Sequence, residues 1–206
     1  MQIAHRSLAS SLAAVALVLA SAPSFGSTVT YLSSAAFLAH VGPGAYTENF
    51  DGLANLPSGP VPFSGGGFSY TISAPGDIYA SGDFVGTSFP YEVLTINFTS
   101  GNVTALGGNF FSSDLGDAFV ATPITLTLSD ATSVTFTPTS ASDSYRGFTS
   151  DVAISSLTMT LTETQFQSLY AGLDNLTVGA VPEPGTLALL GLGMTGLLVS
   201  RRRTVV

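Results

Sequence analysis

Residues 124–128, Ile-Thr-Leu-Thr-Leu, decide the fold, because apolar residues and threonines alternate in them with a period of two. Successive side chains of a β-strand point to opposite faces of the sheet, so this alternation predicts a half-buried strand with threonines on the outer face. The same alternation recurs, more or less strictly, in residues 93–98, 103–111, 134–137 and 157–162. The pattern therefore predicts several antiparallel strands, each with one buried face.

Turn-forming residues separate these stretches at short intervals, for example at residues 75–77, 100–102 and 129–130. Several short strands with such spacing are typical of a sandwich or barrel. We expect one short helix at residues 34–40, capped by Ser33 or Ser34 and ended by Gly42-Pro43. Residues 56–67 are rich in glycine and proline and are expected to form a long loop.

The composition excludes several function classes. The chain has 13 acidic residues and 5 arginines, and it has no lysine and no cysteine. Arg146 is the only basic residue besides histidine between residues 27 and 180. So acidic a body cannot neutralise phosphates, which excludes nucleic acid as a partner. The absence of cysteine and lysine also excludes thiol nucleophiles, disulfides, zinc–thiolate and iron–sulfur sites, Schiff bases and P-loops.

The first 26 residues have the pattern of a secretory signal peptide. Arg6 gives a short positive region, an apolar run follows at residues 8–19, and small residues close the segment. Ser24 and Gly26 satisfy the need for small residues at positions −3 and −1, so we predict a mature start at Ser27.

The C-terminal segment, residues 181–206, combines a proline-bounded start, an uncharged run and a basic end. A helix over residues 185–200 would be about 24 Å long, which is short for a bilayer core of about 30 Å. We nevertheless predict a short transmembrane helix. Arg201, Arg202 and Arg203 follow the run near the end of the chain, and such residues prefer the cytoplasmic side. The G-x-G-x-x-G pattern at residues 191–196 lacks the preceding strand and following acid of a dinucleotide site, so we assign no cofactor.

Pro182-Glu183-Pro184, the short Leu/Gly-rich span and the terminal arginines resemble the PEP-CTERM sorting signal of Gram-negative bacteria. The resemblance implies an exosortase, an integral-membrane protease-transpeptidase, as processing partner. It also implies an intermediate held briefly in the inner membrane before release to the cell surface or medium, among exopolysaccharide. The expected domains are a signal peptide at 1–26, an extracellular domain at 27–180 and a sorting segment at 181–206.

The body also resembles, more loosely, the β-sandwich of many small PEP-CTERM proteins. The similar stretches are residues 48–53, 145–151 with 154–157, and 173–177. The resemblance implies an all-β, two-sheet antiparallel sandwich of jelly-roll type, similar to carbohydrate-binding modules. Residues 173–177 would then lie in the last strand.

The acidic residues of the body suggest sites of two kinds. Asp77 with Asp83, and Asp114 with Asp117, are candidate pairs for glycoside hydrolysis, but aspartates in turns usually bond their own backbone, so we expect solvated turn acids. The other hypothesis is a structural calcium ion. Asp51 and Asp174 are the residues to test first, because the first and last strands of a jelly roll are often neighbours. We assign no metal ligand and no catalytic residue.

For the remaining candidate residues we predict structural roles rather than functional ones. We expect His40 to complement a helix end and Arg146 to pair with an acid on a neighbouring loop or strand. The aromatic residues between Tyr70 and Tyr91 either pack in the core or form a platform for sugar rings, and the absence of tryptophan favours the core.

We therefore predict an exported surface or extracellular-matrix protein without enzymatic activity. Its role would be structural or glycan-associated within exopolysaccharide or biofilm, with an exosortase as partner and exopolysaccharide as a further one. The alternative is a secreted glycan-acting hydrolase that uses a carboxylate pair.

Overall fold

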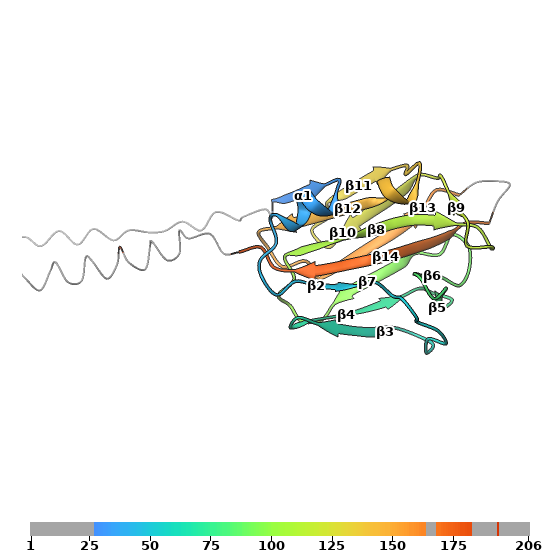
Figure 1. Ribbon diagram of the computed structural model, residues 1–206, viewed down its shortest axis with the longest axis horizontal. Coiled ribbons are helices and arrows are strands. Elements are labelled where there is room, and N and C mark those ends of the chain that lie inside the picture. Colours follow the sequence, from blue (N-terminus) through green and yellow to red (C-terminus); the bar gives the residue numbers. More distant parts are fainter. Residues whose placement is uncertain (1–26, 164–167, 183–192, 194–206) are drawn as a thin grey trace, which may run out of the picture.

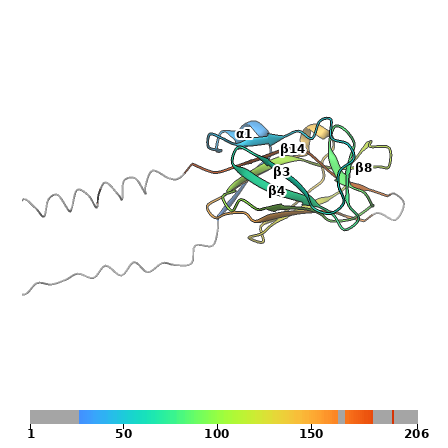
Figure 2. The same cartoon turned by 90° about the horizontal axis from the view of Figure 1, so that it is seen from below.

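The computed structural model describes residues 27–163, 168–182 and 193 of the chain. Within that part, two antiparallel sheets face each other and enclose one main core (Figure 1). The view turned by 90° shows the two layers from the side (Figure 2). This arrangement confirms the prediction of an all-β protein built from two antiparallel sheets.

The larger sheet has eight strands in the order β1-β12-β8-β14-β6-β5, with β2 beside β14 and β9 beside β8. Its strands are β1 (Thr28–Tyr31), β2 (Tyr46–Glu48), β5 (Ile78–Ala80), β6 (Val85–Thr87), β8 (Ala105–Ser113), β9 (Phe119–Val120), β12 (Tyr145–Ser150) and β14 (Tyr170–Gly179). The smaller sheet has six strands in the order β11-β10-β13-β7-β4-β3. Its strands are β3 (Val61–Gly65), β4 (Phe68–Ser73), β7 (Leu94–Phe98), β10 (Ile124–Leu128), β11 (Ser133–Phe136) and β13 (Ser156–Leu161).

Residues 124–128 form β10, as their alternation predicts. The side chains of Ile124 and Leu126 are fully buried, whereas Thr125 and Thr127 lie on the outer face. The hydroxyl of Thr125 shares a hydrogen bond of 2.9 Å with that of Thr135 on the neighbouring strand. Alternation therefore places the apolar side chains in the core and pairs the hydroxyls across the outside of the sheet.

The main core consists of inward-facing side chains from both sheets. The largest that are fully buried are Tyr70, Phe50, Phe110, Phe148, Ile72, Leu94, Ile96, Leu106, Ile124, Leu126 and Leu157. Burial of each such side chain contributes about 1.5–3 kcal/mol relative to exposure. A body without disulfides therefore has a core large enough to hold two sheets together.

A short helix, α1 (Ser34–Leu38), covers part of the outer face of the larger sheet. The hydroxyl of Ser33 accepts a hydrogen bond from the backbone N–H of Ala36, which confirms the predicted N-cap. Phe37 is fully buried against Gly147 of β12, where an added Cβ would lie 2.8 Å from the Phe37 ring. A 3₁₀ turn, η1 (Ala141–Asp143), precedes β12.

The prediction of a continuous loop at residues 56–67 is wrong for its second half. Residues 61–65 form β3, in which Pro62 lies opposite Thr71 of β4. Since β3 is the edge strand of the smaller sheet, a proline that cannot donate a ladder hydrogen bond is tolerated there. Gly66 and Gly67 then form the tight turn into β4, both with positive φ.

The last strand, β14, contains a register shift between Asp174 and Thr177 where it pairs with β8. Asn175 adopts a φ of 51° at this bulge, a conformation that asparagine tolerates better than most residues. Asp174 faces outward by alternation with Gly172, and the bulge leaves the side chain of Asn175 exposed next to it. Asn109 of β8 lies beside both.

The two ends of the described body lie at the same end of the sandwich (Figure 1). The backbone N–H of Ser27 donates to Asp151, which directly follows β12. Residues 1–26 and 183–192, which hold the expected signal peptide and the start of the sorting helix, lie outside the described part, as do residues 194–206. Within the described part, no helix has the length and apolar character needed to cross a membrane.

Candidate functional site: an aromatic groove on the larger sheet

A row of four residues crosses the outer face of the larger sheet at one level. Tyr79 of β5 lies opposite Gly86 of β6, Gly86 lies opposite Gly172 of β14, and Gly172 lies opposite Phe111 of β8. Two aromatic side chains thus flank two adjacent positions that have no side chain. The row leaves a hollow beside Gly86.

Both glycines are required by close approaches. A Cβ on Gly172 would lie 2.5 Å from the ring of Phe111, and a Cβ on Gly86 would lie 2.6 Å from the carbonyl oxygen of Ala171. Phe111 therefore lies over Gly172. Phe84 packs edge-on against Phe111, with ring centroids 5.0 Å apart.

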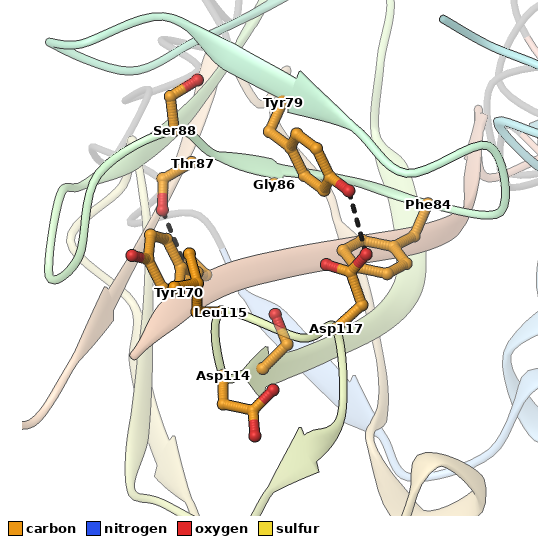
Figure 3. Close-up of a pocket in the computed structure, with 11 residues that line it drawn as sticks. Tyr79, Phe84, Gly86, Thr87, Ser88, Asp114, Leu115, Asp117 and Tyr170 are labelled. Atoms are coloured by element: carbon orange, nitrogen blue, oxygen red, sulfur yellow. Dashed lines mark hydrogen bonds between the residues drawn. The ribbon is translucent and has the colours of Figure 1, made fainter. Parts of the chain in front are cut away.

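The first depression has a volume of about 170 Å³ and lies at the β5–β6 end of the row. Figure 3 shows Tyr170 and Leu115 on one side of it, and Tyr79, Phe84 and Asp117 on the other. Tyr79 is 40% exposed and Leu115 is 83% exposed, so both present apolar surface to solvent.

Asp114 and Asp117 belong to the turn between β8 and β9 and line this depression. One carboxylate oxygen of Asp114 accepts hydrogen bonds from the backbone N–H groups of Gly116 and Ala118, at 2.9 and 3.0 Å. One oxygen of Asp117 accepts the hydroxyl of Tyr79 at 2.9 Å (Figure 3). This hydrogen bond to the carboxylate raises the pKa of Tyr79. The turn therefore carries two carboxylates in fixed positions.

The second depression, of about 390 Å³, is more open and shares Phe84 with the first. Its polar lining comes from β8, from the bulge of β14 and from the loops before β6 and β12. These residues are Asp83, Asn109, Ser142, Ser144, Asp174 and Asn175. We call the two depressions together the aromatic groove.

The carboxyl group of Asp174 lies among other acids. Burial raises its pKa, hydrogen bonding from the backbone N–H of Asn175 opposes that rise, and repulsion from Asp51 and Asp83 adds to it. The structure therefore brings together Asp51 and Asp174, the two residues singled out for calcium. Across residues 27–163 and 168–182, however, no group of three or more histidine and acidic side chains is arranged to hold a metal ion.

The other candidate residues lie apart from the groove. Asp77 accepts a hydrogen bond from the backbone N–H of Gly59 and lines neither depression. His40 contacts the carbonyl of Ala36 at 2.9 Å, near the C-terminal end of α1 as expected. Tyr70 is 1% exposed and belongs to the core.

The predicted pairing of Arg146 with an acid takes an indirect form. Asp143, on the 3₁₀ turn before β12, acts on the guanidinium through its charge. The guanidinium lies 3.6 Å from the centroid of the Phe136 ring and donates to the carbonyl oxygens of Asp143 and Tyr145. Burial lowers the pKa of this group. The charge of Asp143 opposes this lowering, and the face of the Phe136 ring also attracts the cation. Arg146 lines neither part of the groove.

The sequence pattern did not separate the aromatic residues of the core from those that line the groove. Tyr70 is a core residue as preferred, but Tyr79 and Phe84 line the groove. The sequence patterns did not single out Tyr170 and Phe111, which also line the groove. The adjacent pair Phe110-Phe111 held a usable signal, because in a strand only one of two neighbouring residues can face the core.

Of the sorting residues, only Pro182 lies in the described part, where an added Cβ on Gly42 would lie 3.6 Å from its ring. The sorting residues Glu183, Pro184, Arg201, Arg202 and Arg203 lie outside it. The backbone N–H of Gly42 also donates to the carbonyl of Ala180 at 2.8 Å. The first residue of the Pro-Glu-Pro sequence is thus close to the folded body.

Comparison with known proteins bears on the tail more than on the body. The native structure of a family 35 carbohydrate binding module from Clostridium thermocellum matches over 75% of this chain and 92% of that chain, at 12% identity. The TM-score is 0.29, so this similarity indicates neither a shared fold nor a shared ligand. None of the curated proteins matches the chain. Residues 180–203 match the PEP-CTERM protein-sorting motif, so the chain carries the sorting signal of an exported protein that an exosortase processes.

Proposed function

We propose that the chain is an exported β-sandwich protein of jelly-roll type that binds glycan in the aromatic groove and has no catalytic activity. The observation that carries this proposal is the pair of depressions built around Tyr79, Phe84, Phe111 and Tyr170, with Gly86 in the lining of the first. Ligand sites are typically concave, with apolar walls and a few fixed polar groups, and the groove has this composition.

The chemistry of the groove suits a sugar chain. The apolar faces of sugar rings stack on aromatic side chains, and sugar hydroxyls donate to carboxylate and amide oxygens. The first depression offers Tyr79 and Tyr170 with two aspartates, and the second offers Asn109 and Asn175 beside Phe111. A sugar chain lying along the groove would meet both kinds of contact.

The sorting motif supports the place that we propose for such binding. After signal-peptide cleavage, the tail would hold the precursor in the inner membrane until the exosortase releases or transfers it. The body would then lie at the cell surface or in the extracellular matrix, among exopolysaccharide. Its role there would be that of a structural or glycan-associated component of a biofilm.

Binding to the exopolysaccharide of the producing strain tests this proposal directly. The released protein is purified from culture medium and its affinity measured by calorimetry. Tyr79→Ala with Tyr170→Ala should weaken binding at least tenfold. Tyr31→Ala is the matched control, because this half-buried tyrosine lies on β1, at the opposite edge of the same sheet. Full binding by the double variant, or no binding by the unaltered protein, would contradict the proposal.

Hydrolysis of a glycan is the second candidate function, because one observation favours it. Asp83 and Asp174 line the same depression, and the pKa of Asp174 is raised by burial and by its acidic neighbours. A carboxyl with a raised pKa near a second carboxylate is the arrangement that retaining and inverting glycosidases use. Release of reducing ends from the same exopolysaccharide, abolished by both Asp174→Asn and Asp83→Asn, would establish the enzyme.

A further inference from the structure

We propose that the aromatic groove selects glycans that carry protonated amino groups, such as partly de-N-acetylated hexosamine polymers, over neutral and uronate-bearing ones. This inference rests on the proposed glycan binding and names the class of sugar. It follows from the charges that line the groove, from the free oxygens of two carboxylates and from the rings beside them.

All charged residues that line the two depressions are acidic. Asp114 and Asp117 line the first, and Asp83 and Asp174 line the second. The only arginine of the described part, Arg146, lies over Phe136 and donates to two carbonyls elsewhere. No described cation of the protein is therefore available to neutralise the groove, and a uronate carboxylate entering it would meet only like charge.

The carboxylates of the first depression keep binding capacity for a ligand. Backbone N–H groups occupy one oxygen of Asp114, and the Tyr79 hydroxyl occupies one oxygen of Asp117. Among the described residues, the second oxygen of each carboxylate accepts no hydrogen bond. An ammonium group has three donors and no acceptor, so it matches two partly free carboxylates better than a hydroxyl does.

The aromatic side chains add to the same preference. Tyr79 contacts Asp117 through its hydroxyl, and Phe84 lies next to Tyr79 with ring centroids 6.3 Å apart. A cation near the face of an aromatic ring is attracted by the negative charge density there. A hexosamine unit would stack its apolar face on one ring while its ammonium group lies between a ring and a carboxylate. A neutral sugar makes only the first of these contacts.

The test compares three oligosaccharides of equal length: partly de-N-acetylated chitin, fully acetylated chitin and a uronate oligomer. Affinities of the released protein are measured at about pH 5.5, where ordinary aspartates are ionised. We expect the amino-bearing oligomer to bind at least tenfold more tightly than the acetylated one, and the uronate oligomer not to bind. The preference should weaken as salt is added, because opposite charges are screened.

Two isosteric changes separate a site-specific preference from general attraction to an acidic protein. Asp114→Asn keeps an oxygen for the two backbone N–H groups, and Asp117→Asn suits a residue whose φ is 62°. The double variant should lose most of the preference and still bind the acetylated oligomer. Asp151→Asn removes one negative charge from a residue that lines neither depression, and it should leave the preference unchanged.

The outcomes distinguish the inference from the proposed function. Equal affinity for the amino-bearing and acetylated oligomers, tighter binding of the uronate, or an unchanged preference in the double variant would overturn the inference alone. Failure to bind any of the three also overturns it. The proposed function falls if the exopolysaccharide of the producing strain is not bound, or if the variant with Tyr79→Ala and Tyr170→Ala binds it fully.

Discussion

The backbone N–H of Val181 donates to the hydroxyl oxygen of Thr104 at 2.8 Å, which ties the start of the sorting motif to the residue before β8. The motif begins at residue 180, so its first residues are part of the folded sandwich. In the described part there is no linker between the last strand, which ends at Gly179, and Pro182. An exosortase that cuts near the Pro-Glu-Pro sequence therefore works close to the surface of the body.

Thr104→Val should lower the melting temperature by about 1–6 °C. Loss of one hydrogen bond costs about 0.5–1.5 kcal/mol, and 1 kcal/mol shifts the melting temperature of a domain of this size by about 2–4 °C. Thr104→Ser keeps the hydroxyl and is the control, measured by the same thermal unfolding. Equal melting temperatures for the two variants would show that the hydrogen bond to Val181 does not stabilise the body.

Asp174→Asn should raise the melting temperature at neutral pH. The folded-state pKa of Asp174 is raised, so its contribution to stability is fully present below the unfolded value of 3.8 and is lost as pH rises through the folded pKa. The gain should amount to no more than a few degrees, because a partly exposed carboxylate is screened by solvent. It should shrink as pH falls toward 3.8, and a gain that grows on acidification would contradict the repulsion from Asp51 and Asp83.

Cleavage before Ser27 should create an ion pair with Asp151. The backbone nitrogen of Ser27 lies 2.7 Å from a carboxylate oxygen of Asp151, and removal of the signal peptide would make that nitrogen an ammonium group. Exposed ion pairs contribute about 0.2–1 kcal/mol. Asp151→Asn should therefore lower the melting temperature by up to about 4 °C in protein that starts at Ser27.

The same substitution should have less effect in protein whose N-terminus is acetylated, since the charge is then absent. N-terminal sequencing of the released protein identifies the mature start independently. A start other than Ser27 would remove the basis for this ion pair.

Gly172→Ala should destabilise the body by about 1–3 kcal/mol, because the new methyl group would lie 2.5 Å from the Phe111 ring. Gly116→Ala is the matched control, since its Cβ would meet only an Asp114 oxygen at 3.4 Å. Denaturant unfolding of both variants gives the comparison. If Gly172→Ala proves as stable as the control, then Phe111 does not lie over Gly172 as described.

Calcium and magnesium at equal ionic strength should raise the melting temperature by the same few degrees, through screening of Asp51, Asp83, Asp174 and the other acids. A rise specific to calcium and reversed by chelator would instead assign a calcium site. It would point first to Asp51 and Asp174, which the structure places within electrostatic reach of each other.

The sequence by itself determined the elements whose signals are local. The alternation at residues 124–128 is enough to assign β10 and its buried face, because side-chain direction in a strand depends only on parity. The sequence also predicted a serine cap for α1, at Ser33 or Ser34, and the structure places it at Ser33. The sorting signal was equally accessible, since its order of proline, apolar run and arginines is contiguous in the chain.

Only the tertiary structure decided the groove. Tyr79, Gly86, Phe111 and Gly172 form one row because the strands β5, β6, β14 and β8 are neighbours in a particular register, and sequence patterns do not give the register between distant strands. The same reason hid the ring of Phe136, over which the guanidinium of Arg146 lies. Residues close in sequence reveal which way each side chain points, whereas the pairing of distant strands determines which side chains meet.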